Sequence, residues 1–342
     1  MIVKCNIMNE FTNALADVSV GNYIPLMVIS LILLIGGADK LLDATEDLAK
    51  KLGTSEFIIG LTIVALGTSL PEIFVGLQSV SKETENLAMG AIVGSNISNI
   101  ALIFGVACIG REIYPRKNIT SKRQYIPLIG SAILLGFFLY SDNAINLFEA
   151  FCILLILPVF LYVIYSEKNV GVDIQDDSNK SKQSNVLWSL IVLIVSFIAL
   201  YFGSEGVVLA GKGMGEVFGI SQIIIGLIVV AVGTSLPELA VTIGAIMKKR
   251  TDVVVGNVIG SNVLNIVLVV PIIGFFGSGK SLDPVLFQRD YFVMIFLTLF
   301  FALFVYLQTK KSIFKSIRLI NFSGYLFVII YILYILNLVE II

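Results

Sequence analysis

The sequence predicts an all-α integral membrane protein in which ten transmembrane helices form two inverted five-helix repeats. Three observations lead to this prediction. Of the 342 residues, 57% are hydrophobic and 14% are charged, and the mean hydropathy is +0.96, which is far more apolar than a soluble domain. Apolar runs long enough to cross a bilayer recur along the whole chain, and one polar motif occurs twice inside such runs.

Ten apolar spans follow one another along the chain. A helix needs about 20 predominantly apolar residues to cross the hydrocarbon core. Several spans are longer than this, which indicates tilt or extension beyond the membrane. The predicted helices cover residues 23–50, 55–81, 86–110, 124–141, 145–166, 187–213, 219–247, 252–275, 290–308 and 320–341.

Positive charge is distributed unevenly between the two sets of alternate connections. Most of the 23 Lys and Arg residues lie in one set, at 50–51, 111–123, 168–182, 248–250 and 310–318. Connections rich in Lys and Arg stay on the cytoplasmic side. We therefore expect a multi-pass protein of the cell membrane with both termini outside. Residues 1–22 form the N-terminal extracellular segment, and they lack the pattern of a signal peptide.

The two halves of the chain are repeats. LGTSEFIIGLTIVALGTSLPE at 52–72 aligns with FGISQIIIGLIVVAVGTSLPE at 218–238, at an offset of 166 residues. The same offset aligns MGAIVGSNISNI at 89–100 with VGNVIGSNVLNI at 255–266. Because each repeat has an odd number of spans, the second enters the membrane from the opposite side. Residues 23–166 are the first repeat, 167–186 a polar cytoplasmic linker too short to fold alone, and 187–342 the second repeat.

The shared GTSLPE motif predicts a broken helix. Pro71 has no N–H and its ring crowds the carbonyl four residues earlier, so we expect the helix to open around Gly67. Carbonyls from about Ala65 to Thr68 then lose their partners, which is tolerable only beside a protected polar cavity. Oxygen atoms gathered there are the ligands that Na⁺ or Ca²⁺ accepts. The motif adds three oxygen-bearing side chains: Thr68, Ser69 and Glu72.

The second copy brings the same groups from the opposite direction. A lone carboxylate at the centre of a membrane costs about 3 kcal/mol on insertion scales. Two facing carboxylates without Lys or Arg nearby in sequence need a cation to neutralise them. A simple proline kink explains one such motif, but its inverted recurrence favours a cation site. The residues concerned are Ala231, Thr234, Ser235, Pro237 and Glu238.

A GSNxxN motif lies in the span that follows each broken helix. Ser95 and Asn99 are four residues apart and share one helix face, as do Ser261 and Asn265. The glycines allow close helix approach, and helix packing alone is the alternative explanation of the motif. The remaining amides point elsewhere and are expected to bond to the opened backbone: Asn96 and Asn262.

GTSLPE followed by GSNxxN, present twice and inverted, resembles the two α-repeats of the cation/calcium exchanger superfamily, specifically the prokaryotic sodium/calcium exchangers. The resemblance covers the whole ten-span plan. It implies that the second, third, seventh and eighth spans hold the ions, while the first and sixth slide across them to alternate access. The implied activity is secondary antiport, in which Na⁺ enters and Ca²⁺ leaves. The transported ions are the partners together with the lipid bilayer, and no cofactor or obligatory protein partner is expected.

The resemblance also assigns ligands by motif position. Glu72 and Glu238, with the carbonyls of Thr68 and Thr234, would form the calcium site. The flanking sodium sites would use the Ala65 and Ala231 carbonyls with the side chains of Thr68, Ser69, Thr234, Ser235, Ser95 and Ser261. Asn265, opposite Asn99, departs from the many family members that carry Asp there, which leaves two central carboxylates and puts stoichiometry and ion choice in question.

Other functions are disfavoured. The chain has no histidine, which removes Ser-His and Cys-His nucleophile pairs, HExxH metal sites and histidine proton shuttles, so an enzyme such as an intramembrane hydrolase is not expected. The net charge of −1 gives no basic surface for nucleic acid. Residues 274–281 match the P-loop pattern but end an apolar span. A Ca²⁺/H⁺ antiporter, K⁺ involvement in Na⁺/Ca²⁺ exchange, and a simple ion channel remain as alternatives.

Overall fold

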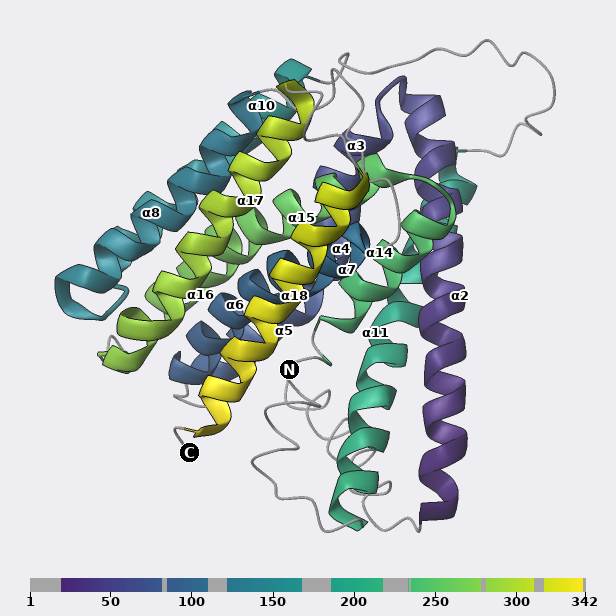
Figure 1. Ribbon diagram of the computed structural model, residues 1–342, viewed down its shortest axis with the longest axis horizontal. Helices are drawn as coiled ribbons and strands as arrows, with labels where there is room; N and C mark the ends of the chain where they lie inside the picture. The colour runs from purple at the N-terminus through teal and green to yellow at the C-terminus, as the bar shows by residue number, and fades with distance from the viewer. Residues whose placement is uncertain are drawn as a thin grey trace.

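The computed structural model describes residues 20–81, 85–109, 122–167, 186–217, 233, 235–277, 281–310 and 317–340. Every regular element in these ranges is helical (Figure 1). Five of the apolar stretches in these ranges are composed of successive helical segments, some of them π-helical. The elements are α2 (Val20–Leu52), α3 (Glu56–Ile59), η1 (Gly60–Val64), α4 (Ala65–Thr68), α5 (Leu70–Ser81), α6 (Glu85–Ser98), η2 (Asn99–Phe104), α7 (Gly105–Cys108), η3 (Lys122–Gln124), α8 (Tyr125–Asp142), α9 (Leu147–Leu154), α10 (Ile156–Glu167), α11 (Val186–Val217), α14 (Leu236–Met247), α15 (Thr251–Leu264), η5 (Asn265–Val269), α16 (Val270–Phe276), η6 (Leu286–Tyr291), α17 (Phe292–Lys310) and α18 (Ile317–Glu340).

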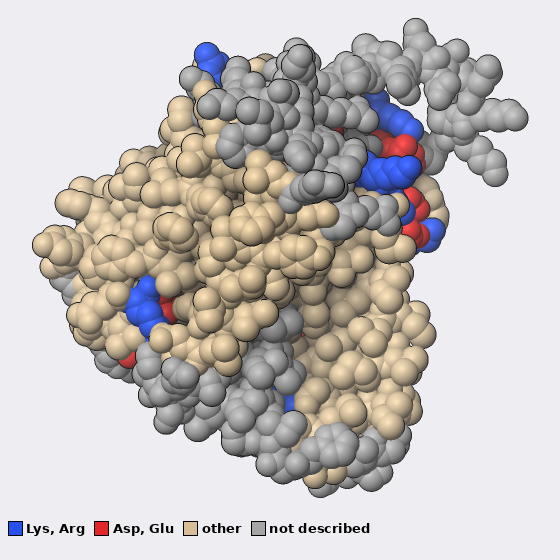
Figure 2. All heavy atoms as spheres, viewed as in Figure 1, with Lys and Arg blue, Asp and Glu red and all other residues tan. Residues whose placement is uncertain are grey.

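Eight helices in the described ranges are long and apolar enough to cross a membrane. Two shorter apolar helices, Tyr125–Ser141 and Leu236–Met247, occupy the places of the fourth predicted span and the second half of the seventh. The predicted residues 219–232 of the seventh span lie outside the described residues. Figure 2 shows that uncharged residues cover most of one face, with the charged side chains gathered mainly at one edge. Such a surface suits lipid rather than water.

The helices α2 and α11 pack against each other along most of their length and run antiparallel (Figure 1). Small residues permit this close approach. A Cβ at Gly203 would lie 2.8 Å from the carbonyl oxygen of Ser30, and one at Gly213 would collide with the ring of Tyr23. At the far end, Lys51 Nζ donates a hydrogen bond to Ser189 Oγ at 2.9 Å. Each half of the chain therefore contributes one helix to a closely packed pair, α2 from the first half and α11 from the second.

The centre of the molecule is built around α15, in which every residue from Asp252 to Leu264 is buried. This helix runs parallel to the chain from α3 to α4. A Cβ at Gly60 would lie 2.9 Å from the Val253 carbonyl oxygen, and one at Gly260 would lie 2.3 Å from that of Leu61. The first GTSLPE stretch and the continuous helix α15 therefore lie side by side at backbone distance, with little room for side chains between them.

Two π-helical segments begin at corresponding residues of the two halves. The segment η2 starts at Asn99 and η5 starts at Asn265, the last residue of each GSNxxN motif. Until that point the backbone is α-helical, because the Asn265 N–H donates to the Ser261 carbonyl oxygen. The predicted common face of Ser261 and Asn265 is therefore confirmed, and the regular helix expected beyond it is locally widened.

Candidate functional site

The first GTSLPE segment contains a break, one to two residues later than predicted. The helix α4 ends at Thr68, Ser69 has φ −83° and ψ 3°, and α5 begins at Leu70. The Ser69 N–H donates to the Ala65 carbonyl oxygen at 3.0 Å. The expectation that the Ala65 carbonyl loses its partner was therefore wrong, although its second lone pair can still bind a cation. Since Pro71 has no N–H, the Gly67 carbonyl lacks its regular helical donor.

The second GTSLPE segment has the same backbone form. Ser235 has φ −93° and ψ 6°, and α14 starts at Leu236 with Pro237 in its first turn. The Leu239 N–H donates to the Ser235 carbonyl oxygen at 3.0 Å, as the Ile73 N–H does to that of Ser69 at 3.2 Å. Two predicted ligands of this segment, Ala231 and Thr234, lie outside the described residues.

Both glutamates are buried, with exposed fractions of 2% for Glu72 and 1% for Glu238. Ser95 Oγ donates to Glu72 Oε1 at 2.9 Å. Neither Glu72 Oε2 nor either carboxylate oxygen of Glu238 has a hydrogen-bond partner among the described residues. The two carboxyl groups interact electrostatically with each other, and the salt bridges of the described residues include neither. Two buried carboxyl groups thus lie together in the core, and no cationic side chain of the described ranges pairs with either.

Hydroxyl and amide groups from α6, α14 and α15 surround the carboxylates. Thr68 Oγ1 lies 3.3 Å from Asn257 Oδ1 and 3.5 Å from Ser261 Oγ. Ser98 Oγ and Ser235 Oγ are 2.6 Å apart. These contacts join each broken helix to the GSNxxN helix of the other half of the chain.

Several buried oxygen atoms in this region have no hydrogen-bond partner among the described residues. Burying a polar atom without a partner is costly, so a group of them indicates a missing ligand. The oxygen set offers carboxylate, hydroxyl and amide atoms, which are hard ligands for Na⁺ or Ca²⁺. The described residues contain no cluster of three or more His, Cys, Asp and Glu side chains, so the charge of this set is limited to two carboxylates. The oxygen atoms are Ser69 Oγ, Glu72 Oε2, Asn99 Oδ1, Glu238 Oε1 and Oε2, Thr242 Oγ1, Asn262 Oδ1 and Asn265 Oδ1.

The amides of the GSNxxN motifs differ in their roles. Asn265 Nδ2 donates to Asn96 Oδ1 at 3.3 Å, which links the two halves. The expectation that Asn96 and Asn262 bond to the opened backbone was wrong. Asn96 Nδ2 donates to the Asn262 carbonyl oxygen at 3.4 Å, and Asn262 Nδ2 donates to that of Val258 at 2.8 Å. Both amides therefore bond to α15.

Two further residues of the site escaped the sequence analysis. Asn257 and Ser98 hold the hydroxyls of Thr68 and Ser235, respectively. At the repeat offset their counterparts are Ala91 and Leu264, so neither belongs to a motif that occurs twice. The sequence signal for both was a polar residue in one repeat at a position where the aligned residue of the other repeat is apolar. The P-loop pattern does not form a phosphate loop in the described part, because Gly274 lies within α16.

Comparisons with known proteins agree with one another. The family model described as sodium/calcium exchanger protein matches residues 22–166 and 188–339. The inner membrane protein YrbG of Escherichia coli is 32% identical over 84% of this chain and 89% of its own length. The sodium/calcium exchanger MaX1 of Methanosarcina acetivorans is 29% identical, over 82% of this chain and 90% of its own. A structure of the sodium-calcium exchanger NCX_Mj, soaked with 10 mM Na⁺ and zero Ca²⁺, has a TM-score of 0.74 and 29% identity, covering 94% of this chain and 100% of that one.

Proposed function

Because the chain belongs to the sodium/calcium exchanger family, we propose that it is a secondary antiporter that admits Na⁺ and drives Ca²⁺ out of the cell. It is a multi-pass membrane protein of a transporter family, not of an enzyme family. The same fold in a solved sodium-calcium exchanger at 29% identity supports the proposal. Ca²⁺ and Na⁺ are then transported substrates rather than cofactors.

The observation that carries the proposal is the pair of buried carboxylates, Glu72 and Glu238, which have three oxygens without a hydrogen-bond partner and no paired cationic side chain in the part of the chain that the structure describes. One Ca²⁺ balances their two negative charges. Serine and threonine hydroxyls and the Ala65 carbonyl around them add neutral oxygens of the kind that Na⁺ accepts. Proton coupling requires only that the carboxylates be protonated, so this surplus of neutral ligands favours Na⁺ over H⁺.

The proposed ligand set is the one that the motifs predicted. The carboxylates and the Thr68 and Thr234 carbonyls bind Ca²⁺. Na⁺ binds on either side of it, to the carbonyls and hydroxyls of both GTSLPE segments and to the GSNxxN serines. Asn99 and Asn265 complete the site through their unpartnered amide oxygens.

The fold divides into two packed units, and this division supports transport by alternating access. The α2–α11 pair is one unit, and the helices that carry the oxygen set are the other. Among the helices of the second unit, α14 packs most extensively against α2. We propose that the pair slides across the ion-binding helices and exposes the site to one side at a time.

The proposed topology has ten spans in two inverted repeats, 23–166 and 187–342, joined by a cytoplasmic linker at 167–186. Parallel packing of the chain from α3 to α4 against α15 supports inversion, since the second span of one repeat and the third span of the other run in the same direction only when each repeat has an odd number of spans. Both termini then lie outside the cell.

The test is Ca²⁺ flux in proteoliposomes containing the purified protein. A Na⁺, K⁺ or H⁺ gradient is imposed in turn, with the membrane potential clamped at several values. We expect Ca²⁺ uptake that depends on a Na⁺ gradient and on voltage. Flux that ignores Na⁺ and follows pH would replace the proposal by Ca²⁺/H⁺ antiport, and an added requirement for K⁺ would extend it to K⁺-dependent exchange.

A further inference from the structure

Asn257 is in contact with two hydroxyl groups of the proposed site. It lies on α15 and is 1% exposed. Its Oδ1 accepts hydrogen bonds from Thr68 Oγ1 at 3.3 Å and from Ser261 Oγ at 3.5 Å. The corresponding residue of the first repeat is Ala91, so only one half of the molecule has such an amide.

The direction of a hydroxyl proton decides whether the oxygen can bind a cation. A hydroxyl binds a cation through a lone pair, so its proton must point at an acceptor elsewhere. Without Asn257, the other acceptors for the Thr68 proton are the Ala65 carbonyl oxygen, 3.4 Å away, and Ser261 Oγ, 3.5 Å away, and both are themselves proposed ligands. Asn257 therefore keeps the lone pairs of two hydroxyls and one carbonyl available to a cation.

We propose that Asn257 is a positioning residue that raises the affinity for Na⁺ by holding the protons of Thr68 and Ser261 away from the ion. This inference rests on the proposed function. It predicts a selective effect, because Ca²⁺ is held mainly by carboxylates whereas Na⁺ depends on the neutral oxygens.

Ion-dependent thermal stabilisation of the purified protein tests this inference without requiring transport. Asn257→Leu removes the acceptor at similar volume and should raise the Na⁺ concentration for half-maximal stabilisation about tenfold, with less than about a twofold change for Ca²⁺. Asn257→Asp keeps acceptor oxygens and should return the Na⁺ value to within about threefold of wild type. Thr298→Val, which removes a buried hydroxyl on α17 bonded to the Met294 carbonyl, is the control.

Three results would overturn the inference. They are an unchanged Na⁺ concentration for half-maximal stabilisation in Asn257→Leu, an equal change in this concentration for Na⁺ and Ca²⁺, or a Na⁺ concentration in Asn257→Asp as high as in Asn257→Leu. Absence of any Na⁺ stabilisation in the wild type would overturn it as well. A normal Na⁺ response without Na⁺-driven flux would contradict the proposed function alone.

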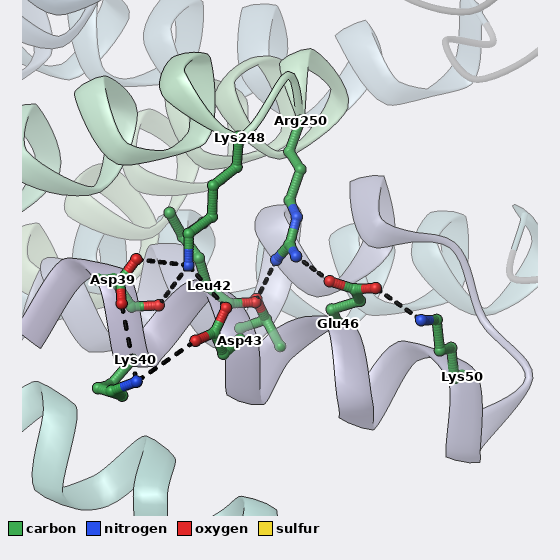
Figure 3. Close-up of polar contacts among 9 residues, drawn as sticks. Asp39, Lys40, Leu42, Asp43, Glu46, Lys50, Lys248 and Arg250 are labelled. Atoms are coloured by element: carbon green, nitrogen blue, oxygen red, sulfur yellow. Dashed lines mark hydrogen bonds and ion pairs between the residues drawn. The ribbon is translucent and has the colours of Figure 1, made fainter. Parts of the chain in front are cut away.

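A separate observation concerns an ion-pair cluster between α2 and the turn that joins α14 to α15 (Figure 3). Lys248 Nζ lies 2.7 Å from Asp39 Oδ1 and 2.6 Å from Asp43 Oδ1. Arg250 contacts the Glu46 carboxylate and the Leu42 carbonyl oxygen. The three acidic residues are spaced by four and three positions, so they lie on one face of α2.

The turn presents both basic side chains to α2. Lys249 adopts φ 58°, in the left-handed region, and the Arg250 N–H donates to the Ala245 carbonyl oxygen at 2.8 Å. Lys249 is exposed, whereas the side chains of Lys248 and Arg250 are only 24% and 13% exposed. Burial lowers the pKa of Lys248, but its bonds to Asp39 and Asp43 outweigh this and raise that pKa, so the side chain stays charged.

Among the residues that the structure describes, the cluster occurs at only one end of the α2–α11 pair. At the repeat offset, the residues of α11 that correspond to the three acids are Glu205, Leu209 and Lys212. That set has no net charge and cannot bind a basic turn in the same way. The cluster therefore favours one of the two positions of α2 against α14, and the part of the chain that the structure describes holds no counterpart for the other.

We infer that these five charged residues form a latch that holds this end of α2 closed against α14 and so biases the exchanger toward one conformation. Movement of α2 must break several partly buried charge contacts together, and such contacts are screened less than surface pairs. The inference rests on the proposed sliding of the α2–α11 pair.

Cysteine accessibility tests the latch independently of transport. Leu42 is fully buried between the latch and α14, and its side chain lies against Gly244. In a background with Cys5, Cys108 and Cys152 replaced by Ser, Leu42→Cys should react about tenfold faster with a soluble maleimide when Lys248→Gln and Arg250→Gln are added. Lys249→Gln, on the same turn, should leave the rate unchanged.

A charge exchange makes the test specific to the ion pairs. Lys248→Asp alone should expose the cysteine, and Lys248→Asp with Asp39→Lys and Asp43→Lys should restore protection to within about threefold. Equal effects of Lys249→Gln, or no restoration by the exchange, would contradict the latch. These readouts do not involve Na⁺ or Ca²⁺ flux, so they are independent of the proposed ion specificity.

Discussion

Ser69 and Ser235 have nearly the same backbone conformation, φ −83° with ψ 3° and φ −93° with ψ 6°, at corresponding positions of two segments 166 residues apart. Each residue directly precedes a proline-containing first turn that carries a buried glutamate. Their hydroxyls differ, since that of Ser235 pairs with Ser98 and that of Ser69 has no partner among the described residues. The backbone of the two half-sites is thus alike, but their side-chain chemistry is not.

Neutralising either buried glutamate should abolish Ca²⁺ transport. Glu72→Gln or Glu238→Gln leaves one carboxylate to balance a divalent ion, and the lost charge-assisted contact of about 3 kcal/mol corresponds to roughly a hundredfold in affinity. Ca²⁺ uptake into proteoliposomes measures this. Glu149→Gln is the matched control, since that buried glutamate caps α9 and glutamine can keep the cap. Near wild-type flux in either site variant would contradict the assignment.

Pro71→Ala should weaken cation binding by about three- to tenfold. The new N–H at residue 71 can bond to the Gly67 carbonyl and withdraw that oxygen from the site. Helix content, measured by circular dichroism, should stay constant or rise. Pro25→Ala in α2, far along the chain from the break, serves as the control. Unchanged Na⁺ and Ca²⁺ affinities in Pro71→Ala would show that the proline does not shape the site.

Asn265→Asp should preserve Na⁺/Ca²⁺ exchange. Asn265 Nδ2 donates to Asn96 Oδ1, and only a protonated Asp can replace that donor. Two carboxylates are already buried nearby, so the added group is expected to remain neutral. The ratio of Na⁺-driven Ca²⁺ uptake in Asn265→Asp to that in the wild type should then change by no more than about twofold across the pH range tested. If this substitution first confers Na⁺ dependence, the wild type is a proton-coupled antiporter.

Gly67→Ala should slow transport through a collision with α11. A Cβ at this position would lie 1.9 Å from ring atoms of Phe197, so the ring must move. The turnover rate should fall several-fold, because a shifted Phe197 disturbs the contact between α11 and the break. Phe197→Leu should restore it in the double variant. Additive losses instead of rescue would show that the two residues act separately.

The sequence analysis succeeded where the chain repeats itself. The break near Pro71, the burial of both glutamates and the common face of Ser261 and Asn265 follow from motifs present twice and from helix geometry. Asn257 and Ser98 could not be recognised in that way, because each is polar in one half only. The partner of the Ala65 carbonyl was missed because the helix continues to Ser69 before it opens. The missing N–H of Pro71 predicts which carbonyl loses its donor, that of Gly67, but it does not predict the residue at which the backbone turns.

The ion pairs of α2 show a second limit. Asp39 lies in an apolar span, and the residues beside it in the sequence do not show which long-range partner its charge has. Its pairing with Lys248, more than 200 residues away in the chain, depends on how the α14–α15 turn meets α2. Long-range charge pairing of this kind is set by tertiary packing, which local patterns do not encode.

The tight contact between α2 and α11 has a consequence for leakage. With Gly203 and Gly213 pressed against the partner helix, the two cannot separate without losing most of their contact surface. Under the alternating access proposed above, a barrier made by one helix on the inner side and a barrier made by the other on the outer side would be mechanically linked, so that opening one would force the other shut. Uncoupled ion slippage through an exchanger of this design requires the pair itself to come apart. Enlarging either glycine should therefore produce a leaky transporter before it produces an inactive one.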